Sequence, residues 1–315
     1  MFCGAAAARR YHARMSPRGV QVLLFALHAA IGIAQRVGSG VRMRSGDPWG
    51  DWDWYWQTLR MDDLRADLAG SLWHLHSQPP LLNLLGGVLG KTFGDAHLEA
   101  LEWVWRALAA GSVVLGYRIV HSITGRPRLA AVTGLLLALH PGLVVFASYP
   151  MYTLPCAFLV LLAVERLAAQ VDRTRNAAGA APSIGPAVAA VGVVCTLILL
   201  RSAYHLALLA LVVPLAALTI GARWRRFAAI SVLVCLPAVG WDAKNQSLYG
   251  VFGASSWSGL GLYRVAADGQ PDERRAALGP MFAELDAYDR PSRYVPYGFA
   301  RTSDVPTLSR DDFNN

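Results

Sequence analysis

The sequence GDPWGDWDWYWQ occupies residues 46–57, and HLHSQPP follows at residues 74–80. Three carboxylates, those of Asp47, Asp51 and Asp53, lie here among tryptophans, between a first apolar segment and a series of later ones. Tryptophan and tyrosine prefer the headgroup level of a bilayer, whereas a carboxylate must stay hydrated or paired. This stretch therefore indicates a loop at the membrane surface in which a charged group has a function.

The composition is that of a protein that crosses a membrane several times. Apolar residues make up 54% of the 315 residues and charged residues only 16%, and soluble domains are considerably richer in charge. The net charge of +8 comes mostly from basic residues in short segments between apolar runs. Membrane topology explains basic residues in such places, so we expect no nucleic-acid partner.

Seven segments are apolar and long enough to be candidate membrane spans, which need about 20 residues each. The sequence therefore predicts an all-α, multi-pass bundle of transmembrane helices. The first segment is expected to remain as an anchor, because Gln35 and Arg36 stand where a cleaved signal peptide needs small residues. The segments are residues 19–37, 98–120, 128–148, 151–169, 184–200, 203–220 and 227–241.

The distribution of Lys and Arg predicts the orientation. The N-terminal tail and the basic loops near Arg126, Arg173 and Arg223 fall on one side if the seven spans are consecutive, and that side is cytoplasmic. We therefore expect an integral membrane protein, in the plasma membrane if bacterial, with its site facing outside. Its parts are a cytoplasmic tail (1–18), a membrane module (19–242) with an outer loop (38–97), and an extracytoplasmic C-terminal segment (243–315).

Two short helices are expected within the outer loop. Residues 61–73 place apolar side chains at helical intervals with charged ones between them, which predicts an amphipathic helix on the membrane surface. Residues 81–93 are apolar but too short to span. They predict an interfacial or re-entrant segment that begins at the rigid bend of Pro79 and Pro80.

The order of these features resembles the GT-C superfamily of glycosyltransferases that use polyprenyl-phosphate sugars, and is most similar to protein O-mannosyltransferases and aminoarabinose transferases. The resemblance rests on Asp51 four residues before Tyr55, on the HSQPP motif, and on LLRSAYH and KNQSLYG further along, and it covers residues 19–260. Trp52 separates the two acidic residues that are usually adjacent in those families. The chain is also shorter than they are, which indicates a truncated chain.

The resemblance implies transfer of a sugar from a lipid phosphate to an acceptor that the sequence does not identify. Asp51 is the first candidate for the base that deprotonates the acceptor hydroxyl, Asp53 the second and Asp47 the third; ordinary loop carboxylates are the alternative. The partners are then membrane lipid and the donor. The cysteines within apolar runs have no metal-ligand spacing. We expect no cofactor, with a divalent metal as the alternative that the sequence does not support.

The remaining candidates would bind substrate. Arg201 would bind the donor phosphate, or would instead be an anchor that snorkels to the interface. Lys244 would assist at the same level, or be an ordinary interfacial lysine. Trp52, Trp54 and Trp56 would seat the loop at the headgroups, with sugar stacking as the alternative. The full set expected to bind substrate is His76, Gln78, Arg201, Tyr204, His205 and Lys244.

Two other classes of protein remain open. A transporter, channel or flippase usually carries ionisable residues near the middle of its spans. Here charges inside spans are scarce: Glu102 and Arg106, one helical turn apart and able to pair, and Glu165 and Arg166 near an inner end. A catalytically inactive protein of the same fold is the third reading.

Overall fold

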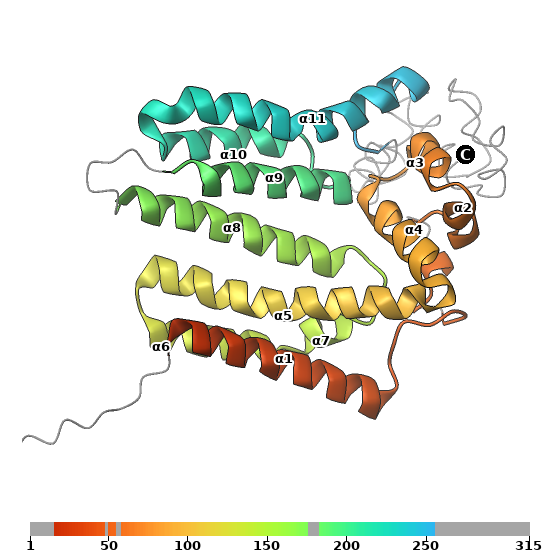
Figure 1. Cartoon of the computed structure of the whole chain (residues 1–315), viewed down its shortest axis with the longest axis horizontal. Coiled ribbons are helices and arrows are strands. Elements are labelled where there is room, and N and C mark those ends of the chain that lie inside the picture. Colours follow the sequence, from red (N-terminus) through yellow and green to blue (C-terminus); the bar gives the residue numbers. More distant parts are fainter. Residues whose placement is uncertain (1–15, 48–49, 55–57, 176–182, 256–315) are drawn as a thin grey trace, which may run out of the picture.

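The computed structural model describes residues 16–47, 50–54, 58–175 and 183–255, and it forms only helices in these ranges, without a strand (Figure 1). The all-α fold expected from the sequence is thus confirmed. The α-helices are α1 (Pro17–Ser39), α2 (Met61–Ala66), α3 (Leu68–His74), α4 (Leu81–Phe93), α5 (His97–Thr124), α6 (Pro127–Ala138), α7 (Pro141–Phe146), α8 (Thr153–Arg175), α9 (Gly185–Leu200), α10 (Ala207–Leu218) and α11 (Trp224–Tyr249).

Four helical segments in the described part of the chain are long and apolar enough to cross a membrane: α1, the segment 81–124 that contains α4 and α5, α8, and the segment 221–249 that contains α11. The other expected spans correspond to the shorter apolar helices α6, α9 and α10, of 12 to 16 residues. Four candidate spans indicate an integral membrane protein, and a total of seven stays a prediction.

The long helices lie side by side in a bundle (Figure 1). α5 packs against α1, α6 and α8, α8 also packs against α9, and α9 packs against α10 and α11. Many large side chains on the outside of this bundle are apolar and exposed, including those of Val22, Leu136, Leu218 and Leu233. An outer surface of this kind suits lipid surroundings better than water.

The expected span 128–148 is not one helix. α6 ends at Ala138, and α7 begins at Pro141 after a break at His140, whose Nδ1 accepts a hydrogen bond from the Gly142 N–H. Proline disfavours the helical conformation of the residue before it, but it is well suited to the first position of a new helix. The continuous helix predicted here was therefore wrong.

The expected helix 61–73 is also divided, into α2 and α3. Asp67 lies between them in a non-helical conformation (φ −142°, ψ 84°), and its Oδ1 accepts a hydrogen bond of 2.9 Å from the Gly70 N–H. Aspartate is a strong helix N-cap, so it competes with the continuous helix that the apolar spacing predicts. The helix at residues 81–93 has the predicted bounds, and its position relative to a membrane stays a prediction.

Helices α2, α3 and α4 lie together at one end of the bundle (Figure 1). Close packing between them depends on glycine. A Cβ atom on Gly86 of α4 would lie 2.3 Å from Cη2 of Trp52, and one on Gly90 would lie 2.4 Å from Sδ of Met61. The absence of side chains at these positions allows the acidic loop and α2 to lie directly on α4.

Candidate functional site

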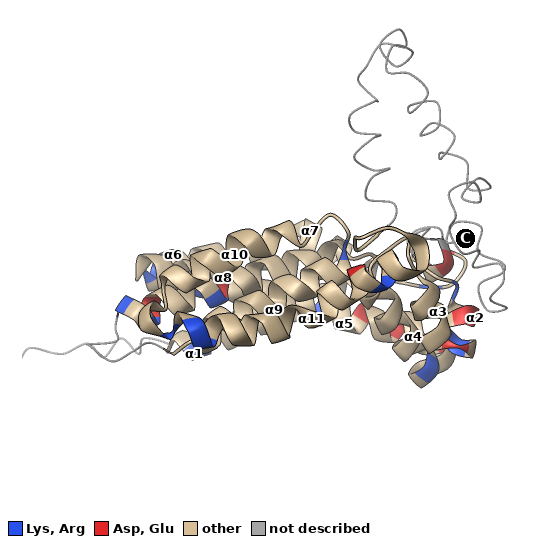
Figure 2. Ribbon diagram, turned by 90° about the horizontal axis from the view of Figure 1, so that it is seen from above, with Lys and Arg blue, Asp and Glu red and all other residues tan. Residues whose placement is uncertain are grey.

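Charged side chains gather mainly at the two ends of the helix bundle, and the stretch between the ends is largely uncharged (Figure 2). The end that carries α2, α3 and α4 also contains the beginning of α5 and the final turns of α9 and α11 (Figure 1). Segments distant in sequence thus meet there. All the site residues expected from the sequence belong to this end.

The acidic loop is held by its own carboxylates. Asp51 accepts hydrogen bonds from the Gly46 N–H (2.6 Å to Oδ2) and from the Asp53 N–H (3.3 Å to Oδ1). Asp53 accepts a bond of 2.9 Å from the Met61 N–H at the start of α2. Partial burial raises the pKa of the Asp53 carboxyl, and the Met61 N–H only partly opposes that shift. Asp47 forms an ion pair with Arg44 at 3.5 Å.

Trp52 does not seat the loop at the headgroups. Its side chain is fully buried, its Nε1–H donates to the Leu59 carbonyl at 2.8 Å, and its ring lies against Gly86. It is a core residue that attaches the acidic loop to α4. The Trp54 side chain, Tyr55 and Trp56 lie outside the described part of the structure.

The HSQPP segment is joined to the end of α11. The Lys244 ammonium donates to the carbonyls of Leu75 (2.6 Å) and Trp73 (3.1 Å), and it lies 3.7 Å from the centre of the Trp241 ring. The buried His76 ring lies 4.3 Å from the ring of Tyr249. Lys244 thus binds the segment that precedes His76, and two of its three N–H donors are used to hold this loop.

Other residues of the same segment complete this contact. The Tyr249 hydroxyl donates to the His74 carbonyl at 2.6 Å, and the Ser255 hydroxyl donates to the Ser77 carbonyl. Burial and, secondly, the Lys244 charge lower the pKa of His74, which favours its neutral form. Gln78, another of the residues predicted to bind substrate, is buried.

Arg201 lies just beyond the last residue of α9. Its guanidinium is 4.6 Å from the centre of the Tyr152 ring, and it makes no hydrogen bond or ion pair with any residue that the structure describes. Tyr204 donates its backbone N–H to the Arg201 carbonyl at 3.0 Å. Burial raises the pKa of Tyr152 although the Arg201 charge opposes this, so the phenol stays neutral. The five donors of Arg201 remain available to a ligand.

Sequence reasoning missed two buried polar residues in α11, Asp242 and Asn245. Each is only 1% exposed, and the Oδ1 atom of each has no hydrogen-bond partner among the described residues. His205, which is exposed, is close enough for its charge to act on Asp242. The only sequence signal was their position next to Lys244, in the turn where the expected seventh span ends.

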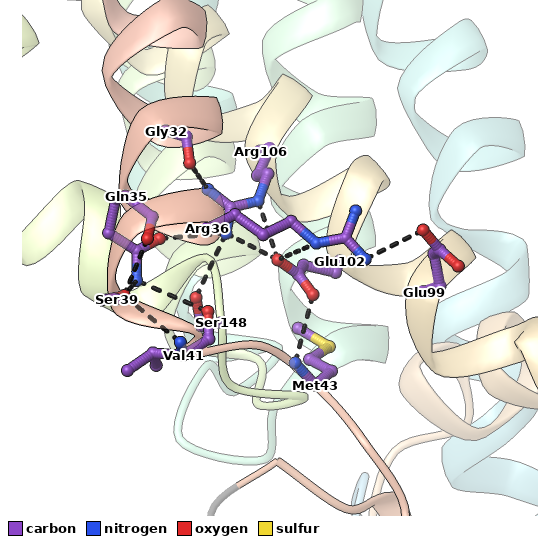
Figure 3. A network of polar contacts seen from close by, with 10 residues as sticks. All are labelled: Gly32, Gln35, Arg36, Ser39, Val41, Met43, Glu99, Glu102, Arg106 and Ser148. Carbon is purple, nitrogen blue, oxygen red and sulfur yellow. Dashed lines mark hydrogen bonds and ion pairs between the residues drawn. The ribbon is translucent and has the colours of Figure 1, made fainter.

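A second polar cluster lies at the beginning of α5 (Figure 3). The Glu102 carboxylate accepts from Arg106 at 2.6 Å, forms an ion pair with Arg36 at 3.5 Å, and accepts from the Met43 N–H at 3.1 Å. Arg106 also donates to the Gly32 carbonyl. The predicted Glu102–Arg106 pair is confirmed, and it connects α1 and α5 to the start of the outer loop.

An apolar cavity of about 190 Å³ adjoins this polar cluster. It lies between α1, α5 and α7, and Phe25, Ile33 and Trp103 line it while remaining partly exposed on the outside of the bundle. Arg106 is at its polar end. The cavity is therefore open to an apolar chain from the surroundings, with charged groups close by.

The candidate site is thus composed of three groups of contacts at one end of the bundle, namely the acidic loop, the junction between His76 and Lys244, and the region of Arg201 and His205. Within the described residues, no group of three or more His, Cys, Asp or Glu side chains is placed to hold a metal ion. No family model, curated protein or solved structure matches the chain significantly.

Proposed function

We propose that this protein is a membrane glycosyltransferase that moves a sugar from a polyprenyl-phosphate donor to an acceptor on the extracytoplasmic side. The reaction requires a group that binds the donor phosphate, a base that accepts the proton of the acceptor hydroxyl, and apolar surroundings for the polyprenyl chain. The first two requirements have candidates at the end of the bundle that carries α2, α3 and α4, and the third has one in the apolar cavity between α1, α5 and α7.

Arg201 carries the proposal. Its guanidinium is positioned over the Tyr152 ring and has no hydrogen bond or ion pair to the described part of the protein. A guanidinium can bind two phosphate oxygens at once, and such charge-assisted bonds are stronger than neutral ones. A half-buried arginine at the end of an apolar helix, without a counter-ion among the described residues, is suited to an anionic ligand at the level of lipid headgroups.

The acidic loop supplies the base. Asp51 is our first candidate and Asp53 the second, as the sequence suggests, and the structure holds both in a loop that packs on α4 through Trp52. Because Asp53 has the raised pKa, it accepts a proton more readily than an ordinary aspartate does. The cavity between α1, α5 and α7 suits part of the donor's apolar chain.

A transporter or flippase is the alternative class. A path would be lined by charged residues, whereas the charges inside α5 and α8 are paired. Glu102 pairs with Arg106 and Arg36, and Glu165 pairs with Arg118 (2.5 Å) and Arg166 (2.8 Å). Pairing of this kind favours a structural role for these residues. The polar groups at the end of the bundle favour chemistry there over passage.

The test is donor binding and turnover by the purified protein in nanodiscs, with polyprenyl phosphate and a panel of polyprenyl-phosphate sugars. Arg201→Ala should weaken binding of polyprenyl phosphate about tenfold to a hundredfold and abolish release of polyprenyl phosphate from the sugar donors. Arg201→Lys should bind with intermediate affinity, because lysine offers only a point charge.

Arg225→Ala is the matched control, because Arg225 also lies over an aromatic ring, that of Trp224 at 5.7 Å, but at the opposite end of α11 from Lys244. It should bind and react like the parent. If Arg201→Lys is indistinguishable from the parent, Arg201 is an interfacial anchor and the phosphate site is refuted. Movement of polyprenyl phosphate across the bilayer without sugar transfer would favour a flippase.

A further inference from the structure

Asp242 and Asn245 occupy one face of α11, three residues apart, near its end at Tyr249. Both side chains are almost completely buried, and neither Oδ1 atom has a hydrogen-bond partner in the part of the chain that the structure describes. A buried acceptor without a donor costs about 1–3 kcal/mol, and more if it is charged. Two such acceptors side by side need a physical explanation.

The surroundings of these acceptors are well defined. The amide nitrogen of Asn245 donates to the Gly253 carbonyl at 2.7 Å, and the Trp241 Nε1–H donates to the Ala254 carbonyl at 3.1 Å. These two hydrogen bonds hold residues 253 and 254, which follow α11, against the same face of the helix. Asn245 keeps its carbonyl oxygen for something else, because its amide nitrogen already has a partner.

His205, in the turn between α9 and α10, is the nearby residue with a side-chain donor that acts electrostatically on Asp242. Its Nδ1 accepts a hydrogen bond of 3.2 Å from the Ala207 N–H, so in the neutral ring the proton is on Nε2. The ring is exposed, and it is close enough for its charge to act on Asp242. A polar ligand that contacts all three residues would meet one N–H donor, that of His205, and two oxygen acceptors, those of Asp242 and Asn245.

We infer that Asp242, Asn245 and His205 bind the hydroxyl groups of a sugar. A hydroxyl group both donates and accepts, which matches a set of two acceptors and one donor. An ammonium group only donates, so it would leave the His205 N–H without an acceptor. A hard cation would require more oxygen ligands than this pair provides, and the described residues contain no cluster of three metal-ligating side chains.

This inference rests on the proposed function, because it assigns to α11 the recognition of the sugar that the donor or the acceptor carries. It adds a binding role for Asp242 and Asn245, which are separate from the phosphate site at Arg201 and from the carboxylates of the acidic loop. The Asp242 carboxylate, whose Oδ1 has no partner among the described residues, is then kept for its hydrogen bond to substrate.

The test compares two probes on the purified protein in nanodiscs: polyprenyl phosphate, which lacks a sugar, and polyprenyl-phosphate mannose or glucose. Asp242→Asn should weaken binding of the sugar-bearing probes about tenfold to a hundredfold, because it removes a charge-assisted hydrogen bond. Binding of polyprenyl phosphate should not change. His205→Gln should show a smaller loss with the same selectivity, and Gln246→Ala, at an exposed neighbouring position of α11, should match the parent.

The source of the sugar is decided by competition with free sugars. If the site binds the acceptor, Asp242→Asn should bind the donors normally. Free monosaccharides that inhibit sugar transfer by the parent should then no longer inhibit the variant. The ligand-free variant should unfold at or above the temperature of the parent, because a neutral amide replaces an unpaired buried carboxylate. A purely structural Asp242 predicts a lower unfolding temperature.

Failure of the inference can be distinguished from failure of the proposed function. Suppose that the parent binds polyprenyl phosphate and that Asp242→Asn binds every sugar-bearing probe and every competing sugar as the parent does. This result refutes the sugar site and leaves the phosphate site unaffected. An equal loss of binding for both probes, together with a lower unfolding temperature, also refutes it. A parent that binds neither probe refutes both proposals.

Discussion

Asp51 and Asp53 are only two residues apart, but they are held in different ways. Both oxygens of Asp51 accept backbone N–H groups of its own loop, whereas Asp53 accepts the N–H of Met61, the first residue of α2. A carboxylate that accepts two hydrogen bonds is well positioned, although it still has lone pairs for a substrate hydroxyl. The two residues can therefore be separated by experiment.

Asp51→Asn is expected to lower sugar transfer by about two to four orders of magnitude, because it removes the proton acceptor. The asparagine carbonyl can still accept the Gly46 N–H, so the amount of protein in the membrane should stay close to that of the parent. The measurement is turnover of a polyprenyl-phosphate sugar donor. Near-normal turnover would exclude Asp51 as the base.

If Asp53 is the base instead, the pH dependence should reveal it. Burial raises the pKa of Asp53, so its active, deprotonated form is lost as the pH falls through a value above the ordinary range for aspartate. The acidic limb of the rate profile should then lie at a higher pH than an exposed aspartate gives. A loss of activity confined to Asp53→Asn would support the same assignment.

The sequence was more informative about which residues belong to the candidate site than about which residues they contact. The aromatic-acidic stretch and Lys244 were recognisable because charged side chains are rare next to apolar spans. The two hydrogen bonds of Lys244 to the carbonyls of residues 73 and 75 cross about 170 positions in the chain, and no local pattern encodes such a contact. Asp242 was missed because burial is a property of packing.

At the scale of elements, apolar periodicity predicted where helices occur and failed where they are interrupted. Asp67 and Pro141 each begin a new helix within a segment whose apolar spacing is continuous. Capping depends on a single side chain, whereas periodicity averages over many, so the average conceals the break. The bounds of α4 were predictable because Pro80 and Gly94 stand at its two ends.

The contact between α4 and the acidic loop should be sensitive to one methyl group. Gly86→Ala would place a carbon against the Trp52 ring, and overpacking of this kind costs about 1–3 kcal/mol. The unfolding temperature in detergent should fall by several degrees. Activity should fall as well, since Trp52 supports the loop of Asp51.

Gly240→Ala provides the matched control, because a Cβ on Gly240 in α11 meets nothing within 4 Å. Alanine is also favoured over glycine within a helix by about 1 kcal/mol. This variant should be as stable as the parent or slightly more stable. Equal stability of Gly86→Ala and the parent would show that Trp52 does not press on α4.

For the whole molecule, we expect a cytoplasmic N-terminus and an extracytoplasmic outer loop. A membrane-impermeant maleimide added to intact cells should label a cysteine at Ser45, which is exposed in the outer loop, in a variant without the native cysteines. A cysteine at Ser183, which precedes α9, should react only after the cells are opened. Labelling of Ser183 from outside would contradict the assigned orientation.

Composition was sufficient to predict a helical membrane protein, and the order of apolar segments predicted most of its helices. The lateral arrangement was not predictable, because one apolar helix face resembles another until side chains are packed. Nothing in the segments α5, α8 and α9 indicates that α5 lies between α1 and α8. That the site residues gather at one end could be predicted only by assuming that successive helices alternate in direction.

The shortness of α10 has a consequence for the lipid around it. Its 12 residues rise about 18 Å, far less than the roughly 30 Å of a bilayer's hydrocarbon core. A bilayer that meets this flank has to thin locally, at a cost of fractions of a kcal/mol per Å of mismatch. If α10 crosses the bilayer, headgroups would sink towards the turn between α9 and α10, and under the proposed function a lipid-linked donor would arrive with its phosphate lowered towards the depth of Arg201.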